Sequence, residues 1–234
     1  REQVFPKDFA VLYRTNAQSR SIEEALRKQN IPYKIYGGLS FYQRKEIKDV
    51  LAYCRLTINP NDEEALKRII NYPGRGIGNT TIQKLIVTSN ASNISVWELI
   101  NNLDKYDHKI NKGTCSKIEE FTTLIKSFIS QKENQDAYFL AEHIAKSSGV
   151  FNDLYNDKSP EGVSRFENIQ ELLNGLKDFC ENNKGNLLAN YMRDVALLTN
   201  QDNEKKEDFN KVTLMTVHAA KGLEFPYVFV VGLE

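Results

Sequence analysis

The sequence predicts an α/β fold: a parallel sheet interrupted by a large, all-helical insertion. Short apolar runs typical of buried strands occur near the two ends of the 234-residue chain. Between residues 41 and 206, apolar side chains recur instead at helical spacing. Because strands on both sides of this helical stretch are best buried in one sheet, we expect the middle of the chain to be inserted into an α/β domain.

The first forty residues predict a strand, a helix and a second strand. Residues 9–13 are continuously apolar, and a helical pattern follows, for which Ser19 or Ser21 can provide the N-cap. Residues 33–36 predict a second strand, which ends at Gly37 and Gly38. This order is typical of an α/β unit with parallel strands.

The remaining elements follow from periodicity. The segment at residues 201–210 carries six charges and no aliphatic side chain, which predicts a solvated linker or hinge. Residues 212–217 and 227–231 are β-rich and return the chain to the sheet. Helices are expected near residues 47–54, 66–70, 80–87, 117–129, 137–145, 165–179 and 187–198.

Composition excludes several classes of protein. Lysine and arginine total 31, as do aspartate and glutamate, so the chain is not a uniform polycation. The charge is nevertheless uneven, because residues 1–90 carry 15 basic and 9 acidic side chains.

Three cysteines spaced about sixty residues apart fit neither a disulfide framework nor a zinc site and favour a reducing, cytoplasmic setting. No apolar run approaches the roughly 20 residues that span a bilayer. A start at Arg1 and an end just after a strand-like run suggest a piece of a longer protein.

Two motifs follow predicted strands, where open α/β sheets bind ligands. In the segment at 216–225, His218, Lys221 and Glu224 are spaced three apart, which would place them on one side of a helical turn, and Gly222 permits a positive φ angle. In the segment at 12–20, Arg14 and Asn16 suit a phosphate or a base. The alternative for the first segment is a strand-to-loop connection with solvated charges, and for the second a capped helix start with exposed polar side chains.

Two further segments combine glycine with basic residues. Residues 37–48 contain two glycines, adjacent aromatics and Arg44, a composition found on surfaces that bind single-stranded DNA, but equally in a joint whose aromatic rings anchor a helix. The segment at 71–82 predicts a glycine turn that opens a helix, and such a turn can hold a phosphate on backbone N–H groups, with Arg75 adding charge. Its alternative is a helix–helix turn.

Together these motifs resemble superfamily 1 DNA helicases of the UvrD, Rep and PcrA type, most closely the PcrA branch. The similarity rests on "TVHAAKGLEF" at 216–225, "LYRTNAQSR" at 12–20, "GGLSFYQRKEIKD" at 37–49 and "RGIG" at 75–78, in the family's order. The resemblance implies that residues 1–41 and 207–234 are parts of a second RecA-like motor domain of the P-loop NTPase type. Residues 42–206 would form its inserted helical subdomain.

The resemblance also implies roles for individual residues. Glu224, Lys221 and Gly222 would serve the ATP site, with Mg²⁺ as the accompanying ion in the full-length enzyme. The insertion would swivel on hinges near residues 38–42 and 201–210. Contacts to single-stranded or duplex DNA are expected from Arg14, Asn16, His218, Arg44, Arg75, Gly76, Ile77, Gly78 and Thr80.

The resemblance implies a bacterial, cytoplasmic 3′–5′ helicase that acts on the nucleoid in DNA repair and replication. The chain, however, contains no GxxxxGK[ST] phosphate loop and no Asp-Glu pair after an apolar strand. We therefore expect no catalytic residue, bound nucleotide, ATP hydrolysis or membrane association in this segment alone. The alternative is a non-catalytic module that binds DNA or a protein partner, such as RNA polymerase or a mismatch-repair factor.

Overall fold

The structure, a computed structural model, describes residues 4–202 and 210–232. The chain divides into two compact units. The first, called here the sheet unit, comprises Arg1–Ile47, Lys158–Gly175 and Arg193–Glu234. The second, the helical unit, comprises Lys48–Asp157 and Leu176–Met192. Most of the predicted linker at 201–210 lies outside the described residues.

The sheet unit contains four parallel strands in the order β2–β3–β1–β4. These strands are β1 (Phe9–Tyr13), β2 (Tyr33–Ile35), β3 (Val212–Thr216) and β4 (Tyr227–Val230). The two flanks of the chain therefore do form one sheet, which confirms the predicted α/β class. β1 and β2 are not neighbours, however, because β3 lies between them and pairs with both.

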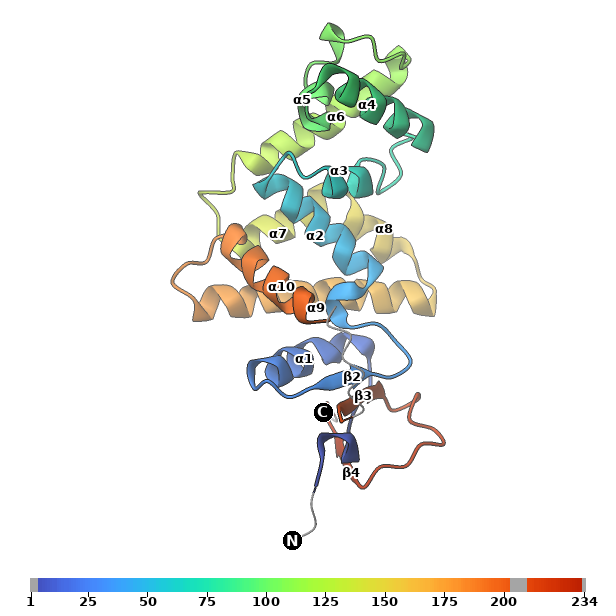
Figure 1. Ribbon diagram of the computed structural model, residues 1–234, viewed down its shortest axis with the longest axis vertical. Helices are drawn as coiled ribbons and strands as arrows, with labels where there is room; N and C mark the ends of the chain where they lie inside the picture. The colour runs from blue at the N-terminus through green and yellow to red at the C-terminus, as the bar shows by residue number, and fades with distance from the viewer. Residues whose placement is uncertain (1–3, 203–209, 233–234) are drawn as a thin grey trace. The chain divides into compact units, whose positions relative to one another are not determined.

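Helix α1 (Ser19–Lys28) joins β1 to β2 and packs on the sheet (Figure 1). Its apolar side chains Ile22 and Leu26 contact a buried cluster around Tyr13 and Leu214. The helix follows a short 3-10 turn, η2 (Asn16–Gln18), so neither predicted serine is its N-cap. The chain turns at Asn30, which has a φ of 54°. A second 3-10 turn, η3 (Phe41–Gln43), precedes α2.

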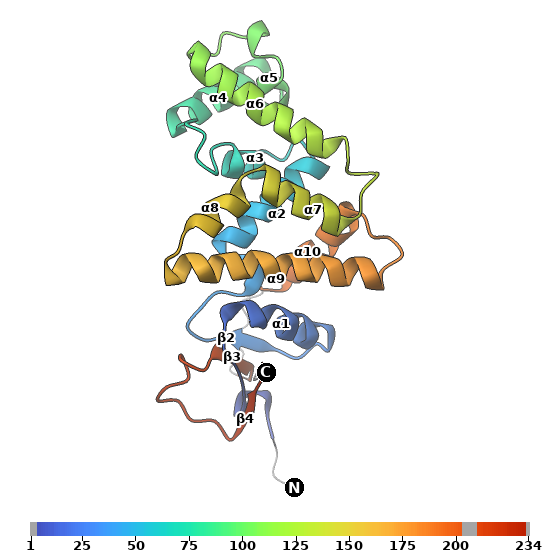
Figure 2. The same ribbon diagram turned by 180° about the vertical axis from the view of Figure 1, so that it is seen from behind.

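The helical unit is built around side chains such as Leu66, Phe121 and Ile144, which are almost fully buried. Several of its helices begin at a side chain that accepts a hydrogen bond from the first turn, for example Asp62 from the N–H of Ala65. Figure 2 shows α4, α5 and α6 gathered at one end of this unit. Its complete helices are α3 (Glu63–Ile69), α4 (Asn79–Ser92), α5 (Val96–Ile100), α6 (Lys112–Ile129), α7 (Ala137–Ser147) and α8 (Val150–Asn156).

Three longer helices contribute residues to both units: α2 (Lys45–Ile58), α9 (Pro160–Asn182) and α10 (Leu188–Asp202). The compact sheet unit thus includes residues 158–175, most of which lie in α9 and which the predicted boundaries place in the insertion. The boundaries at residues 41 and 207 stay a prediction. In the described residues between β2 and β3 there is no strand, as expected. The short helices α5 and α8 were not among the predicted helices.

Candidate nucleic-acid interface

Three loops meet at the carboxyl edge of the sheet. Because β1, β2 and β3 are parallel, their carboxyl ends lie at the same edge. The N–H of Val217 donates to the carbonyl of Tyr13 at 2.9 Å, which joins the loop after β3 to the end of β1. A Cβ added to Gly37 would lie 3.7 Å from the Cβ of Ala219, so the glycine turn after β2 also reaches this loop. The fold therefore brings together motifs some 200 residues apart.

Arg14 and Asn16 lie on the loop after β1 with exposed side chains. Gln18 holds this loop, because its Oε1 accepts hydrogen bonds from the backbone N–H groups of Arg14 at 2.9 Å and Thr15 at 3.1 Å. A Cβ at Gly232 would lie only 2.1 Å from Nε2 of Gln18, so glycine leaves space for this amide. The supporting role of Gln18 was not predicted, although a threonine three residues before a glutamine is a known capping pattern.

His218 and Lys221 are exposed on a turn after β3. The turn is closed by hydrogen bonds from the N–H groups of Ala220 and Ala219 to the backbone and side-chain oxygens of Thr216. Gly222 then adopts a φ of 87°, the positive value allowed for by the sequence. Gly222 ends the turn, so His218 and Lys221 lie on it as the spacing predicted. Glu224 lies after the turn and is exposed.

Arg44 is placed differently from the expected surface residue. Only 8% of it is exposed, and its guanidinium donates to protein acceptors within the sheet unit. Phe41 and Tyr42, the adjacent aromatic pair, are also buried and contact each other edge to face. This segment therefore has the structure of a helix anchor, the alternative considered above. A DNA contact by Arg44 stays untested, but these buried rings are not an exposed stacking surface.

The glycine turn at residues 74–78 opens α4 in the helical unit. Gly76 has a φ of 73°, and Gly78 is the N-cap without a side chain to accept from the helix. The backbone N–H groups of Asn79 and Thr80 have no acceptor among the described residues. Gly76, Gly78 and Thr80 are exposed. The positive end of the helix dipole and these N–H groups are therefore open to an anion.

Arg75 and Ile77 face away from this opening. The guanidinium of Arg75 donates to the carbonyls of Tyr72 and Ser148 at 2.8 and 3.0 Å and lies 5.4 Å from the ring centre of Phe121. Ile77 is fully buried. Both side chains hold the turn in place, and the structure does not present them to a ligand.

A basic residue absent from the sequence motifs lies beside Gly76. A Cβ added to Gly76 would lie 2.5 Å from Nζ of Lys117, an exposed residue of α6. Lys117 thus supplies the positive charge that was expected from Arg75. No sequence signal points to it, because α6 and the turn are about forty residues apart in the chain.

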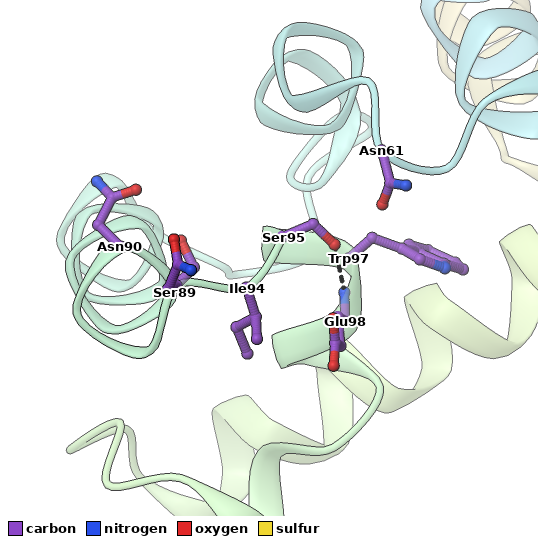
Figure 3. Close-up of a pocket in the computed structure, with 8 residues that line it drawn as sticks. Asn61, Ser89, Asn90, Ile94, Ser95, Trp97 and Glu98 are labelled. Atoms are coloured by element: carbon purple, nitrogen blue, oxygen red, sulfur yellow. Dashed lines mark hydrogen bonds between the residues drawn. The ribbon is translucent and has the colours of Figure 1, made fainter.

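A shallow groove of about 470 Å³ lies between the carboxyl end of α4 and α5 (Figure 3). Trp97 lines it and is half-buried. Ser95 caps α5 in its wall by accepting from the N–H of Glu98 at 3.1 Å. The groove contains none of the predicted site residues.

Within residues 4–202 and 210–232, no three His, Cys, Asp or Glu side chains come together in a way that could hold a metal ion. No helix among these residues has the length and apolar character needed to cross a bilayer.

The fold and the geometry of the sheet edge define an open parallel α/β protein with a helical insertion and exposed polar loops at its carboxyl edge. Comparison with known proteins identifies the family. The model of the UvrD-like helicase C-terminal domain matches residues 1–234, and the chain belongs to this family.

Two relatives illustrate the similarity. The ATP-dependent DNA helicase PcrA of Staphylococcus aureus is 40% identical over 230 residues, which cover 97% of this chain and 31% of the relative. The protein of the same description from Staphylococcus epidermidis is 39% identical over 229 residues, with the same coverage. The chain thus spans about a third of the length of these relatives.

Proposed function

We propose that this chain is the DNA-tracking part of an ATP-dependent 3′–5′ DNA helicase that acts in DNA repair and replication. The observation that carries the proposal is the meeting of Arg14, Asn16 and His218 as exposed side chains at one edge of a parallel sheet. A guanidinium donor and an amide suit phosphate and sugar contacts that do not depend on base sequence. Such contacts are what movement along a strand requires.

In this proposal, residues 1–41 and 207–234 belong to the second RecA-like motor domain, and residues 42–206 form its insertion. Glu224 would hold the ribose of ATP, with Lys221 and Gly222 beside it. Mg²⁺ would neutralise phosphate charge in the full-length enzyme. Closure of a cleft between two motor domains would move the strand past the carboxyl edge of the sheet.

The first prediction concerns the strand contacts in the full-length protein. Arg14→Ala should weaken single-stranded DNA binding about tenfold, because a charge-assisted hydrogen bond contributes roughly 1.5–3 kcal/mol. The slope of log K against log salt should become shallower by about 0.7, as expected for one lost phosphate contact on a single strand. His218→Ala should also lower the affinity for single-stranded DNA, and for this variant we predict no particular change in the salt slope. Fluorescence anisotropy over a salt series measures both quantities.

Lys28→Ala is the matched control for this experiment. Lys28 is exposed in the last turn of α1, about 15 Å from the carboxyl edge by the length of a ten-residue helix. Its removal changes the net charge as Arg14→Ala does, yet should leave affinity and slope nearly unchanged. Wild-type binding and DNA-stimulated ATPase in both Arg14→Ala and His218→Ala would exclude the proposed strand contacts. A loss confined to nucleotide binding would assign Arg14 to the ATP site instead.

The second prediction concerns hydrolysis by the 234-residue chain alone. We expect no DNA-stimulated ATP hydrolysis, because the sequence lacks a phosphate loop to position the γ-phosphate. A phosphate-release assay on the purified chain, with and without single-stranded DNA, measures this directly. Turnover that survives further purification and scales with the amount of chain would contradict the expectation.

A second candidate function is a non-catalytic module that binds duplex DNA or a protein such as RNA polymerase or a mismatch-repair factor. It is favoured by the open start of α4 next to Lys117. Anisotropy of the isolated chain with single-stranded, duplex and forked DNA discriminates the two: duplex binding without nucleotide binding supports the module. Under either proposal we place the protein in the bacterial cytoplasm, associated with the nucleoid and not with a membrane.

A further inference from the structure

Arg44 connects the strand-contacting loop to two helices of the sheet unit. Its Nη1 donates to the carbonyl of Asn16 at 2.9 Å and to Oδ1 of Asn168 in α9 at 2.9 Å. Its Nη2 donates to Oγ of Ser19, the first residue of α1, at 2.6 Å. The guanidinium also lies 5.1 Å from the ring centre of Phe41. One buried side chain thus ties the loop to α1 and α9.

The residues that accept hydrogen bonds from Arg44 are themselves held by further hydrogen bonds. Asn168 is 3% exposed, and while its Oδ1 accepts from Arg44, its Nδ2 donates to Oε1 of Glu46 at 2.6 Å. Ser19 in turn donates to Glu23, whose carboxylate also accepts from the backbone N–H of Phe41 at 3.0 Å. Burial lowers the pKa of Arg44, and the negative charge of Glu23 opposes that shift. Arg44 therefore has little freedom to leave its acceptors.

We propose that Arg44 and Asn168 are positioning residues for the DNA strand: they fix the carbonyl of Asn16, and with it the loop that presents Arg14 and Asn16, without touching DNA. This inference rests on the proposed strand contacts. A loop held only by its own turn would sample several geometries, and a displacement of about 1 Å is enough to cost a bound ligand much of its affinity. Because Asn168 lies in α9, the orientation of this helix also helps to determine the position of the loop.

The geometry distinguishes this role from a direct phosphate contact. Arg44→Lys keeps the positive charge, so a direct phosphate contact would largely survive this substitution. An ammonium is a point donor, however, and lacks the planar fork that reaches Asn16, Ser19 and Asn168 together. Asn168 is buried and bonds to Arg44 and Glu46, so its replacement removes no direct contact with DNA. A positioning role therefore predicts that Arg44→Lys and Asn168→Ala both weaken DNA binding.

The experiment uses the full-length protein with both variants. Arg44→Lys should raise the Kd for an oligothymidylate about tenfold, and Asn168→Ala about threefold to tenfold, measured by fluorescence anisotropy. The DNA concentration that half-stimulates ATPase should rise by the same factors. The rate at saturating DNA should stay within about twofold of wild type, because the loop is re-ordered once the strand is bound.

Glu171→Ala is the matched control, since Glu171 lies one turn after Asn168 in α9. It forms a partly buried contact of 2.7 Å with Arg20 of α1, and among the described residues its hydrogen bonds go to Arg20 and Asn174, not to the 14–18 loop. The control should lower the thermal midpoint yet leave the Kd within twofold. Wild-type affinity in Arg44→Lys and Asn168→Ala, or an equal loss in Glu171→Ala, would overturn the positioning role. If Arg14→Ala and His218→Ala also bind normally, the proposed strand contacts fail with it; if those two weaken binding, only the positioning role fails.

Discussion

Replacing Arg75 by alanine is expected to lower the free energy of unfolding of the chain by about 3 kcal/mol. Nη1 of Arg75 donates to backbone carbonyls at the end of α3 and in the following turn, and Nη2 donates to the hydroxyl of Tyr53 and to the carbonyl of Ser148. Loss of the guanidinium removes these hydrogen bonds, leaves the carbonyl of Ser148 without this donor in a partly buried site, and removes the packing on Phe121. Urea unfolding followed by far-UV circular dichroism measures the change.

Arg55→Ala provides the matched comparison for Arg75. Arg55 also forms ion pairs in the helical unit, with Asp62 and Glu64, but its side chain is 41% exposed. Solvent screens such pairs, so we expect a loss of less than about 1 kcal/mol. Equal effects of the two substitutions, or a stable Arg75→Ala variant with weakened duplex binding, would mean that Arg75 serves the ligand more than the fold.

The sheet could be predicted from sequence because its strands are short apolar runs with clear ends. The order of those strands could not be predicted, because the position of β3 between β1 and β2 depends on pairing across nearly 200 residues. Positions of Arg14 and His218 at strand ends followed from the same runs. Their exposure at a common edge agrees with that expectation, although their DNA contacts stay predictions.

The orientation of individual basic side chains was beyond the reach of sequence patterns. Arg44 and Arg75 stand in glycine-rich, basic segments, which favours a DNA contact by composition alone. Their hydrogen-bond acceptors include Asn168 and the carbonyl of Ser148, which only the folded chain brings near. Lys117 shows the converse, since it reaches the α4 turn from a helix without any motif. A guanidinium that binds carbonyls and one that binds phosphate look alike in sequence.

The start of α4 offers a substitution that should strengthen the fold and weaken the interface together. Gly78 has a φ of −73° and a ψ of 165°, the extended geometry that a side-chain N-cap adopts, and a Cβ there would meet nothing within 4 Å. Gly78→Asp can therefore cap the free N–H groups of α4 without strain. Capping and the favourable helix dipole should raise the free energy of unfolding by about 0.5–1 kcal/mol.

The same carboxylate would occupy the N–H groups that a phosphate needs and would repel it. Gly78→Asp should therefore lower the affinity of the full-length protein for duplex DNA at least about tenfold. Gly78→Asn has the same shape without the charge, so its affinity should fall between the aspartate variant and wild type. Lys117→Ala should make the salt slope shallower by about 0.9, as expected for one lost duplex phosphate. Higher stability with wild-type duplex affinity in Gly78→Asp would remove the start of α4 from the interface, because a bound phosphate and a capping carboxylate compete for the same donors.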